Sequence, residues 1–174
     1  MLDKREFIKG TVIFANLERP RIFQNGNTKH SVRLAVNKSD SNTCNKLQHA
    51  YRKALLEGDT MYGTTAFSQK TNITSPIKEG VQYYGDSYSN YYILDLNTKL
   101  QPQVIDVNKI LLPINCIKPG SFVCVAMSFF PYNVNEKCGI SGKLHSMMFI
   151  RQDKPIVTEI SNALEDFSNY ELDE

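Results

Sequence analysis

Apolar and polar residues alternate along two segments near the start of the chain. Residues 7–17 and 31–36 follow a period of two and are rich in β-branched and aromatic side chains, which is typical of strands with one buried face. Residues 18–30 between them contain Pro20 and an Asn-Gly pair, and both are turn signals. The pattern predicts two strands joined by a long basic loop.

The next segment changes to the three- and four-residue spacing of an amphipathic helix. Asp40 offers an N-cap, and the apolar spacing runs until Gly58 interrupts it. We therefore predict one helix over roughly residues 40–57, packed on the sheet. Its apolar face carries Cys44, Leu47, Tyr51, Ala54 and Leu55.

Strand-like segments dominate the second half of the chain. Residues 59–90 form a polar excursion that glycine and proline punctuate without a sustained period. Alternation returns at residues 91–97, at 104–107 and most clearly at 122–132, which a turn joins to 139–150 as a hairpin. With about six or seven strands and one helix, the chain is predicted to be mainly β: a small antiparallel barrel or sandwich with one packed helix and long loops.

Length and composition narrow the class of protein. The 174 residues, 41% of them hydrophobic, can build one core but are short for two domains. No run of about 18 apolar residues and no signal-peptide pattern occurs, so we expect neither a membrane protein nor a secreted one. The four cysteines are widely spaced without a Cys-x-x-Cys pair, which fits a reducing cytoplasm better than a disulfide or zinc framework.

Motifs for catalysis or metal binding are weak. His30, His49 and His145 fall in a loop, a helix and a strand, with no metal-ligand spacing to any cysteine or acid. The segment 139–142, Gly-Ile-Ser-Gly, is too short for a phosphate loop and lies in a predicted strand, so its glycines indicate a bulge or a bend. We predict that the protein is not an enzyme and has no catalytic residues, no metal and no cofactor.

The net charge of +2 conceals an unequal distribution. Residues 159–174 contain six acids and neither lysine nor arginine, so residues 1–158 carry a net charge of +8. A solvated, lysine-rich surface would explain this surplus. A binding site for a polyanion would explain it too, with the acidic segment occupying that site in place of the polyanion. We therefore divide the chain into a domain of residues 1–158 and an acidic tail of residues 159–174.

The order and spacing of several sequence blocks carry a family resemblance. The blocks are the opening strand with its basic loop, Val-Asn-Lys-Ser-Asp at 36–40, Thr-Ser-Pro-Ile-Lys-Glu-Gly at 74–80, 91–99 with Pro102, 119–133, 137–140, Leu144 and 151–155. Together they resemble the phage single-stranded DNA-binding proteins of OB-fold type. The resemblance implies an OB-like antiparallel barrel that coats single-stranded DNA during phage replication or recombination in the bacterial host cytoplasm, largely without sequence preference.

Such binding needs aromatic rings on which unpaired bases stack. Phe130 and Tyr132 lie on the face of their strand opposite its most apolar residues, so they are the first candidates, and a second core behind that face is the alternative. Tyr91 is a further candidate because Tyr92 shares the apolar face of the same strand. Three more tyrosines in the polar excursion form either a flap over the strands or ordinary packing under a loop: Tyr83, Tyr84 and Tyr88.

Binding also needs cations that track the phosphates. The first predicted loop and the strand after it supply one group, and the later hairpins supply another. A lone lysine is more often a solvated surface charge than a phosphate contact, so the prediction rests on the set and not on its single members. The predicted phosphate contacts are Arg19, Arg21, Lys29, Arg33, Lys99, Lys137 and Lys143.

The resemblance implies that the acidic tail binds a replication or recombination protein. Its candidate residues are Glu165, Asp166, Phe167, Tyr170, Glu171, Asp173 and Glu174. We expect the tail to be mobile and to compete with DNA for the basic surface; a terminal helix packed on the barrel is the alternative, because Ile160, Leu164 and Phe167 share helical spacing. For the whole protein, the alternative function is an interaction or inhibitor module that targets a nucleic-acid enzyme, and both a monomer and a homodimer are compatible with the sequence.

Overall fold

The computed structural model describes residues 5–22, 26–63, 67–69, 72–134, 137–156 and 163–172. The strands are β1 (Glu6–Ile22), β2 (Thr28–Asn37), β3 (Ile77–Glu79), β4 (Tyr91–Thr98), β5 (Gln103–Ile105), β6 (Leu111–Leu112), β7 (Ser121–Val134) and β8 (Lys137–Gln152). The helices are α1 (Ser41–Tyr62), α2 (Gly80–Tyr84) and α3 (Ala163–Asp166), with 3-10 turns η1 (Asp86–Tyr88) and η2 (Ile114–Cys116). None of the helices within these ranges is long and apolar enough to cross a membrane.

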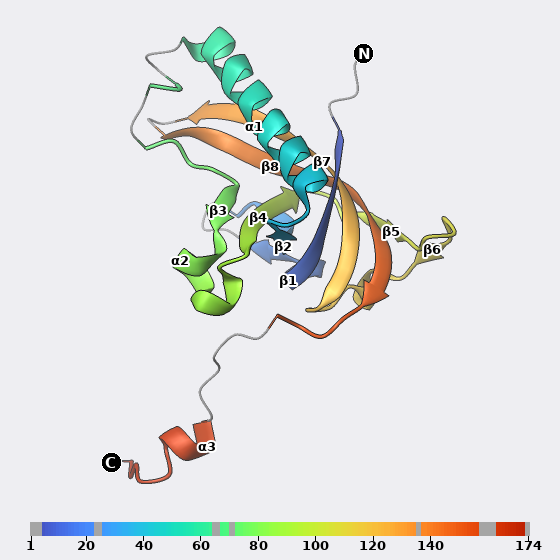
Figure 1. Ribbon diagram of the computed structural model, residues 1–174, viewed down its shortest axis with the longest axis vertical. Coiled ribbons are helices and arrows are strands. Elements are labelled where there is room, and N and C mark those ends of the chain that lie inside the picture. The colour runs from blue at the N-terminus through green and yellow to red at the C-terminus, as the bar shows by residue number, and fades with distance from the viewer. Residues whose placement is uncertain are drawn as a thin grey trace.

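Five of the strands close into a barrel (Figure 1). Strand β1 pairs antiparallel with β2 and β7, β2 pairs with β4, and β7 pairs with β8. A parallel pairing of Asn97 in β4 with Lys143 in β8 closes the ring. The predicted mainly β barrel with one packed helix is confirmed, and β3 and the β5–β6 hairpin extend it at its edges.

The barrel interior is filled by alternate residues of its strands. In β7, Val123, Val125, Met127 and Phe129 are at most 5% exposed, which confirms the face that the sequence assigned to the core. Helix α1 covers one end of the barrel, where the ring of Tyr51 meets the ring of Phe129 edge to face with centroids 6.4 Å apart. The core therefore joins the helix to the longest hairpin.

Helix α1 begins where the sequence predicted and ends later. The carboxylate of Asp40 accepts hydrogen bonds from the Thr43 backbone N–H (3.2 Å) and hydroxyl (2.7 Å), which caps the first turn. The helix continues through Gly58, the predicted stop, to Tyr62. Gly58 is glycine for another reason: the fully buried ring of Phe67 lies where its side chain would be.

The first hairpin is also longer than predicted, which corrects the loop assigned to residues 18–30. Strand β1 continues and β2 begins inside that range, with Arg21 opposite Lys29. Pro20 falls within an irregular register between Asn16 and Arg21, where a residue without a backbone N–H is tolerated. Pairing that resumes beyond this irregularity extends β1 past Pro20 to Ile22, whereas the Asn-Gly pair stays in the connection between the two strands.

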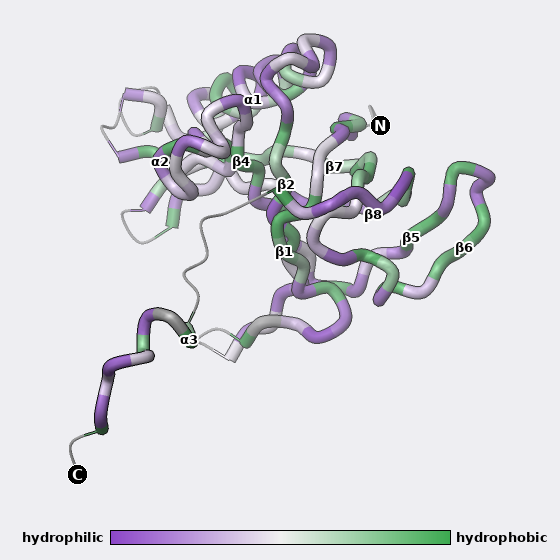
Figure 2. The backbone as a smooth tube through the Cα atoms, turned by 60° about the horizontal axis from the view of Figure 1, so that its bottom comes forward, coloured by the Kyte–Doolittle hydropathy of each residue, from purple (hydrophilic) through white to green (hydrophobic). Residues whose placement is uncertain are grey.

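Short elements from the polar excursion cover part of the outer surface of β2 and β4. Tyr88 of η1 is buried together with Ala35 and Ile93 in a second, smaller core, and Tyr84 packs against it. Tyr84 and Tyr88 therefore pack under the loop, which was the alternative to a flap over the strands, whereas Tyr83 keeps 50% of its surface exposed. Elsewhere, the β5–β6 hairpin projects from the barrel and exposes apolar side chains on both sides of polar residues in its turn (Figure 2).

Candidate nucleic-acid interface

A groove of about 880 Å³ runs over the outside of the barrel where β2, β4 and β8 meet the segment that follows β4. Lys29 of β2, Lys99 after β4, Phe130 of β7 and Lys143 of β8 all line it. These are four of the residues predicted to bind single-stranded DNA. No aspartate or glutamate is among the described residues that line the groove, so its local charge is positive.

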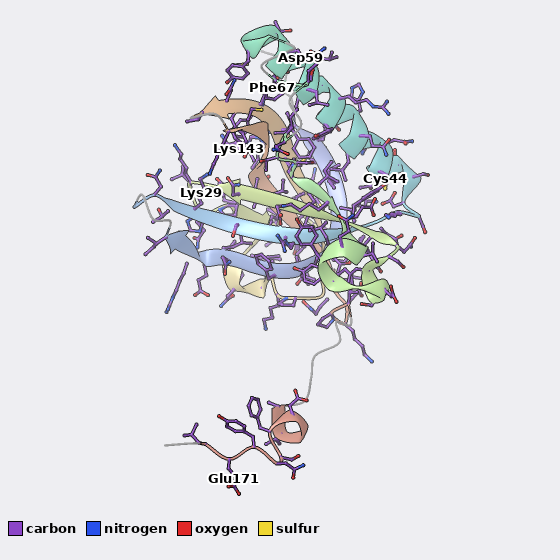
Figure 3. The ribbon with its side chains drawn as sticks, turned by 90° about the vertical axis from the view of Figure 1, so that its left-hand side faces the viewer. Lys29, Cys44, Asp59, Phe67, Lys143 and Glu171 are labelled. Carbon is purple, nitrogen blue, oxygen red and sulfur yellow. The ribbon has the colours of Figure 1, made fainter. Side chains whose placement is uncertain are left out.

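Closure of the barrel brings the three lysines together. His30 pairs with Thr98 at the end of the β2–β4 ladder, so Lys29 and Lys99 are the next residues beyond this end. Lys143 is the residue through which β8 pairs with β4, and Figure 3 shows Lys29 and Lys143 on the same side of the barrel. Neither Lys99 nor Lys143 forms an ion pair within the part of the chain that the structure describes.

Phe130 gives the groove an aromatic surface. Its ring is 42% exposed on the outer face of β7, opposite Ser141 of β8, so the predicted exposure is confirmed. Beside it, Ser128 Oγ and His145 Nε2 share a hydrogen bond of 2.8 Å, and His145 also lines the groove. The groove thus offers a ring for stacking, cations for phosphates, and polar groups that the sequence alone did not single out.

Two other predicted rings lie elsewhere. Tyr132 is partly buried and lies over Gly139, its partner on β8, whose missing side chain leaves room for the Tyr132 hydroxyl. Tyr91 is partly buried against the second core, with its ring centroid 5.9 Å from that of Tyr88. Neither tyrosine lines the groove.

The remaining predicted cations are dispersed. Arg19 on β1 and Lys137 at the start of β8 are exposed but do not line the groove. Arg21 lies on β1, and its side chain is outside the described part of the structure. Of the seven predicted cations, three line the groove: Lys29, Lys99 and Lys143.

Arg33 differs most from the expectation of a free phosphate contact, because it is bound to Asp95 on the neighbouring strand. Its Nε and Nη2 donate to the two carboxylate oxygens at 2.6 and 3.0 Å, and its Nη1 donates to the Tyr84 hydroxyl at 2.9 Å. Lys78 Nζ donates to the same carboxylate at 2.7 Å. The sequence pattern did not reveal this pairing, because it depends on the register between β2 and β4.

This network shifts the ionisation of both partners. The hydrogen bond to Asp95 raises the pKa of the Arg33 guanidinium, although burial acts in the opposite direction. Burial by itself would raise the pKa of Asp95, but hydrogen bonds from Arg33 and Lys78 outweigh it and lower that pKa below its usual value. Both groups are therefore charged at neutral pH.

The described part of the tail contains the short helix α3 and exposed aromatic residues. Leu164 is 86% exposed and Phe167 is 62% exposed, which does not favour a helix packed on the barrel. The rings of Phe167 and Tyr170 meet edge to face at 5.6 Å, and Asp166 and Glu171 are exposed beside them. Ile160, Asp173, Glu174 and the side chain of Glu165 lie outside the described residues.

The sequence matches a known protein family over nearly its whole length. A family model described as "Enterobacter phage Enc34, ssDNA-binding protein" matches residues 8–174. The chain belongs to this family of phage single-stranded DNA-binding proteins. Among curated proteins, no sequence matches the chain. The family is the one that the sequence blocks resembled.

Solved structures of phage single-stranded DNA-binding proteins have the same fold. The protein from bacteriophage Enc34 in complex with ssDNA is 15% identical with a TM-score of 0.67, covering 90% of this chain and 96% of that chain. A second structure of the Enc34 protein is 14% identical with a TM-score of 0.67 and 96% coverage of both chains. The gp2.5 protein encoded by bacteriophage T7 is 17% identical with a TM-score of 0.62, covering 93% of this chain and 99% of that chain. At these identities the likeness shows the fold alone, and it confirms the predicted OB-like barrel.

Proposed function

We propose that this protein binds single-stranded DNA along the groove and coats it during phage DNA replication or recombination, largely without sequence preference. The observation that carries the proposal is the convergence of Lys29, Lys99, Lys143 and the exposed Phe130 in one groove whose described lining contains no acid. Lysines neutralise phosphates whatever the sequence, and every base has a face that can stack on a ring. The family to which the chain belongs supports the same function.

The protein acts in this proposal by binding alone, without a chemical step, in the cytoplasm of the bacterial host. The acidic tail has two roles. Its negative charges compete with DNA for the basic groove, and DNA displaces them when it binds. The displaced tail then recruits a replication or recombination protein, for which the exposed rings of Phe167 and Tyr170 among acidic residues provide a contact surface.

The experiment is a titration of a labelled oligo-dT with the full chain over a range of salt concentrations. For single strands, the slope of log K against log salt falls by about 0.7 for each phosphate neutralised. Replacing Lys29, Lys99 and Lys143 together by alanine should weaken binding and make the slope shallower by about 2. The matched control replaces three exposed lysines outside the groove, Lys53, Lys118 and Lys154, and should leave the slope close to that of the wild type. Absence of binding by the wild type at micromolar concentrations and low salt would contradict the proposal.

A further inference from the structure

The outer face of the β2–β4 ladder continues beyond the groove. Along β2, Lys29, Ser31 and Arg33 point outward, because the residues between them are buried. Arg33 lies four residues from Lys29, or about 13 Å along an extended strand, and Asp95 of β4 is its partner. In Figure 3, α2 lies at the end of these strands remote from Lys29. Lys29 in the groove and Arg33 beyond it therefore lie on the same outer face of the sheet.

Arg33 lies at the centre of a cluster of rings and cations, which we name the Arg33 cluster: Phe14, Arg33, Lys78, Tyr83 and Asp95. The guanidinium carbon is 5.3 Å from the centroid of the Phe14 ring and 5.6 Å from that of Tyr83. Lys78 Nζ is 5.7 Å from the same Tyr83 centroid. Phe14 is 38% exposed and Tyr83 is 50% exposed, so two rings held by cations reach the surface here.

The charge of the Arg33 cluster is unevenly balanced. One carboxylate, that of Asp95, accepts hydrogen bonds from two cations, which leaves a net charge of +1. The three side chains keep between 20% and 29% of their surface exposed, so an incoming anion can reach them. A phosphate group is an acceptor for the same N–H donors that Asp95 now binds.

We propose that the Arg33 cluster is a second contact point for the single strand, and that Asp95 weakens it by competing with phosphate for Arg33 and Lys78. This inference rests on the proposed function of the groove. A strand leaving the groove along β2 meets Phe14 and Tyr83, on which a base stacks, and its phosphate draws Arg33 and Lys78 away from the carboxylate. Asp95 thereby sets the affinity below the value that the cations alone would give.

Replacing the carboxylate by an amide tests the competition directly. Asp95→Asn should tighten oligo-dT binding by about fivefold at 0.1 M salt for each cation that gains a phosphate, and should steepen the salt slope by about 0.7 per cation. The matched control is Asp153→Asn, which also removes one negative charge; Asp153 follows the end of β8 and pairs with one cation, Arg151, whereas Asp95 pairs with two. The control should leave both the affinity and the slope close to those of the wild type.

A second pair of variants tests the stacking surface and remains decisive if Asp95→Asn does not fold. Tyr83→Ala should weaken binding at least fivefold without changing the salt slope, because stacking releases no counterions. Val81→Ala, at a 40% exposed position on the same helix α2, should have no effect. The inference is overturned if Asp95→Asn has no more effect than Asp153→Asn, or if Tyr83→Ala has no more effect than Val81→Ala. In either case, binding of oligo-dT by the wild type still supports the proposed function. A wild type that does not bind oligo-dT contradicts the proposed function instead.

Discussion

Phe129 and Phe130 are adjacent residues on β7 with opposite surroundings, and together they separate binding from folding. Phe130→Ala should weaken binding of oligo-dT by about 1–3 kcal/mol with an unchanged salt slope, because we propose that this 42% exposed residue stacks on bases and it lies outside the buried core. Phe129→Ala should lower the free energy of unfolding by about 3–5 kcal/mol, because that ring is only 5% exposed. Oligonucleotide titration and urea unfolding of both variants measure the two effects. A loss of stability in Phe130→Ala as large as that in Phe129→Ala would show that Phe130 belongs to a core.

The ion pairs of Asp95 give the stability of the fold a pH dependence with a defined sign. Its pKa is lower in the folded protein than in the unfolded chain, so the unfolded state binds a proton first as the pH falls. The contribution of these ion pairs is therefore complete above about pH 4, the ordinary carboxyl pKa, and is lost as the pH falls through the lower pKa of the folded protein. Urea unfolding of the wild type and of Asp95→Asn between pH 7 and pH 3 should show a smaller loss of stability on acidification in the variant. Parallel curves for the two proteins would contradict this.

At the residue level, four of the residues predicted to bind DNA line the groove, whereas the ion pair of Arg33 was not predicted. Lys29, Lys99, Lys143 and Phe130 were found because charge, exposure and strand alternation are local properties. The engagement of Arg33 by Asp95 depends on which residues of β2 and β4 lie opposite each other, and a single sequence does not define that register. The contribution of Tyr83 to the Arg33 cluster likewise depends on how the excursion folds back over the strands.

Among the secondary-structure elements, helix α1 shows how one contact overrides a local signal. Gly58→Ala would favour an isolated helix by about 1 kcal/mol. Here it should instead lower the free energy of unfolding by about 1–3 kcal/mol, because the added methyl group would overlap the buried ring of Phe67. Urea unfolding decides the sign. In the Phe67→Leu background, Gly58→Ala should lower the free energy of unfolding by less. If Gly58→Ala alone raises the free energy of unfolding, the Phe67 ring moves aside without a large loss of packing.

Element boundaries were predicted less well than element types, and the reasons are specific. The long strands, helix α1 and the final hairpin were recognised from their periods, whereas the short elements β3, β6, α2 and α3 were not predicted. The first hairpin was predicted too short because Pro20 is a turn signal in sequence, whereas β1 resumes its pairing with β2 beyond an irregular register. The helix was predicted too short because a glycine required by a distant ring looks the same in sequence as a glycine that ends a helix.

For the molecule as a whole, the distribution of charge predicts how the acidic tail affects binding. A chain truncated after Thr158 should bind oligo-dT more tightly than the full chain at low salt, because it lacks the six negative charges that we propose compete for the groove. The gain should shrink as salt screens both competitors. The melting temperature should stay the same, because Leu164 and Phe167 are exposed in the full chain. Unchanged affinity together with a lower melting temperature would identify the tail as structural.

The seam of the barrel lies in the floor of the groove. Strands β4 and β8 are joined there through the pairing of Asn97 with Lys143, while every other neighbouring pair of barrel strands is joined over a long antiparallel ladder. The lysines that line the groove lie on both sides of this seam. A nucleic-acid backbone that contacts all of them would therefore add contacts between β4 and β8, which are otherwise joined by a single pair of residues. In that arrangement the bound nucleic acid stabilises the closed barrel, so the separation of β4 from β8 costs more free energy in the complex than in the free protein.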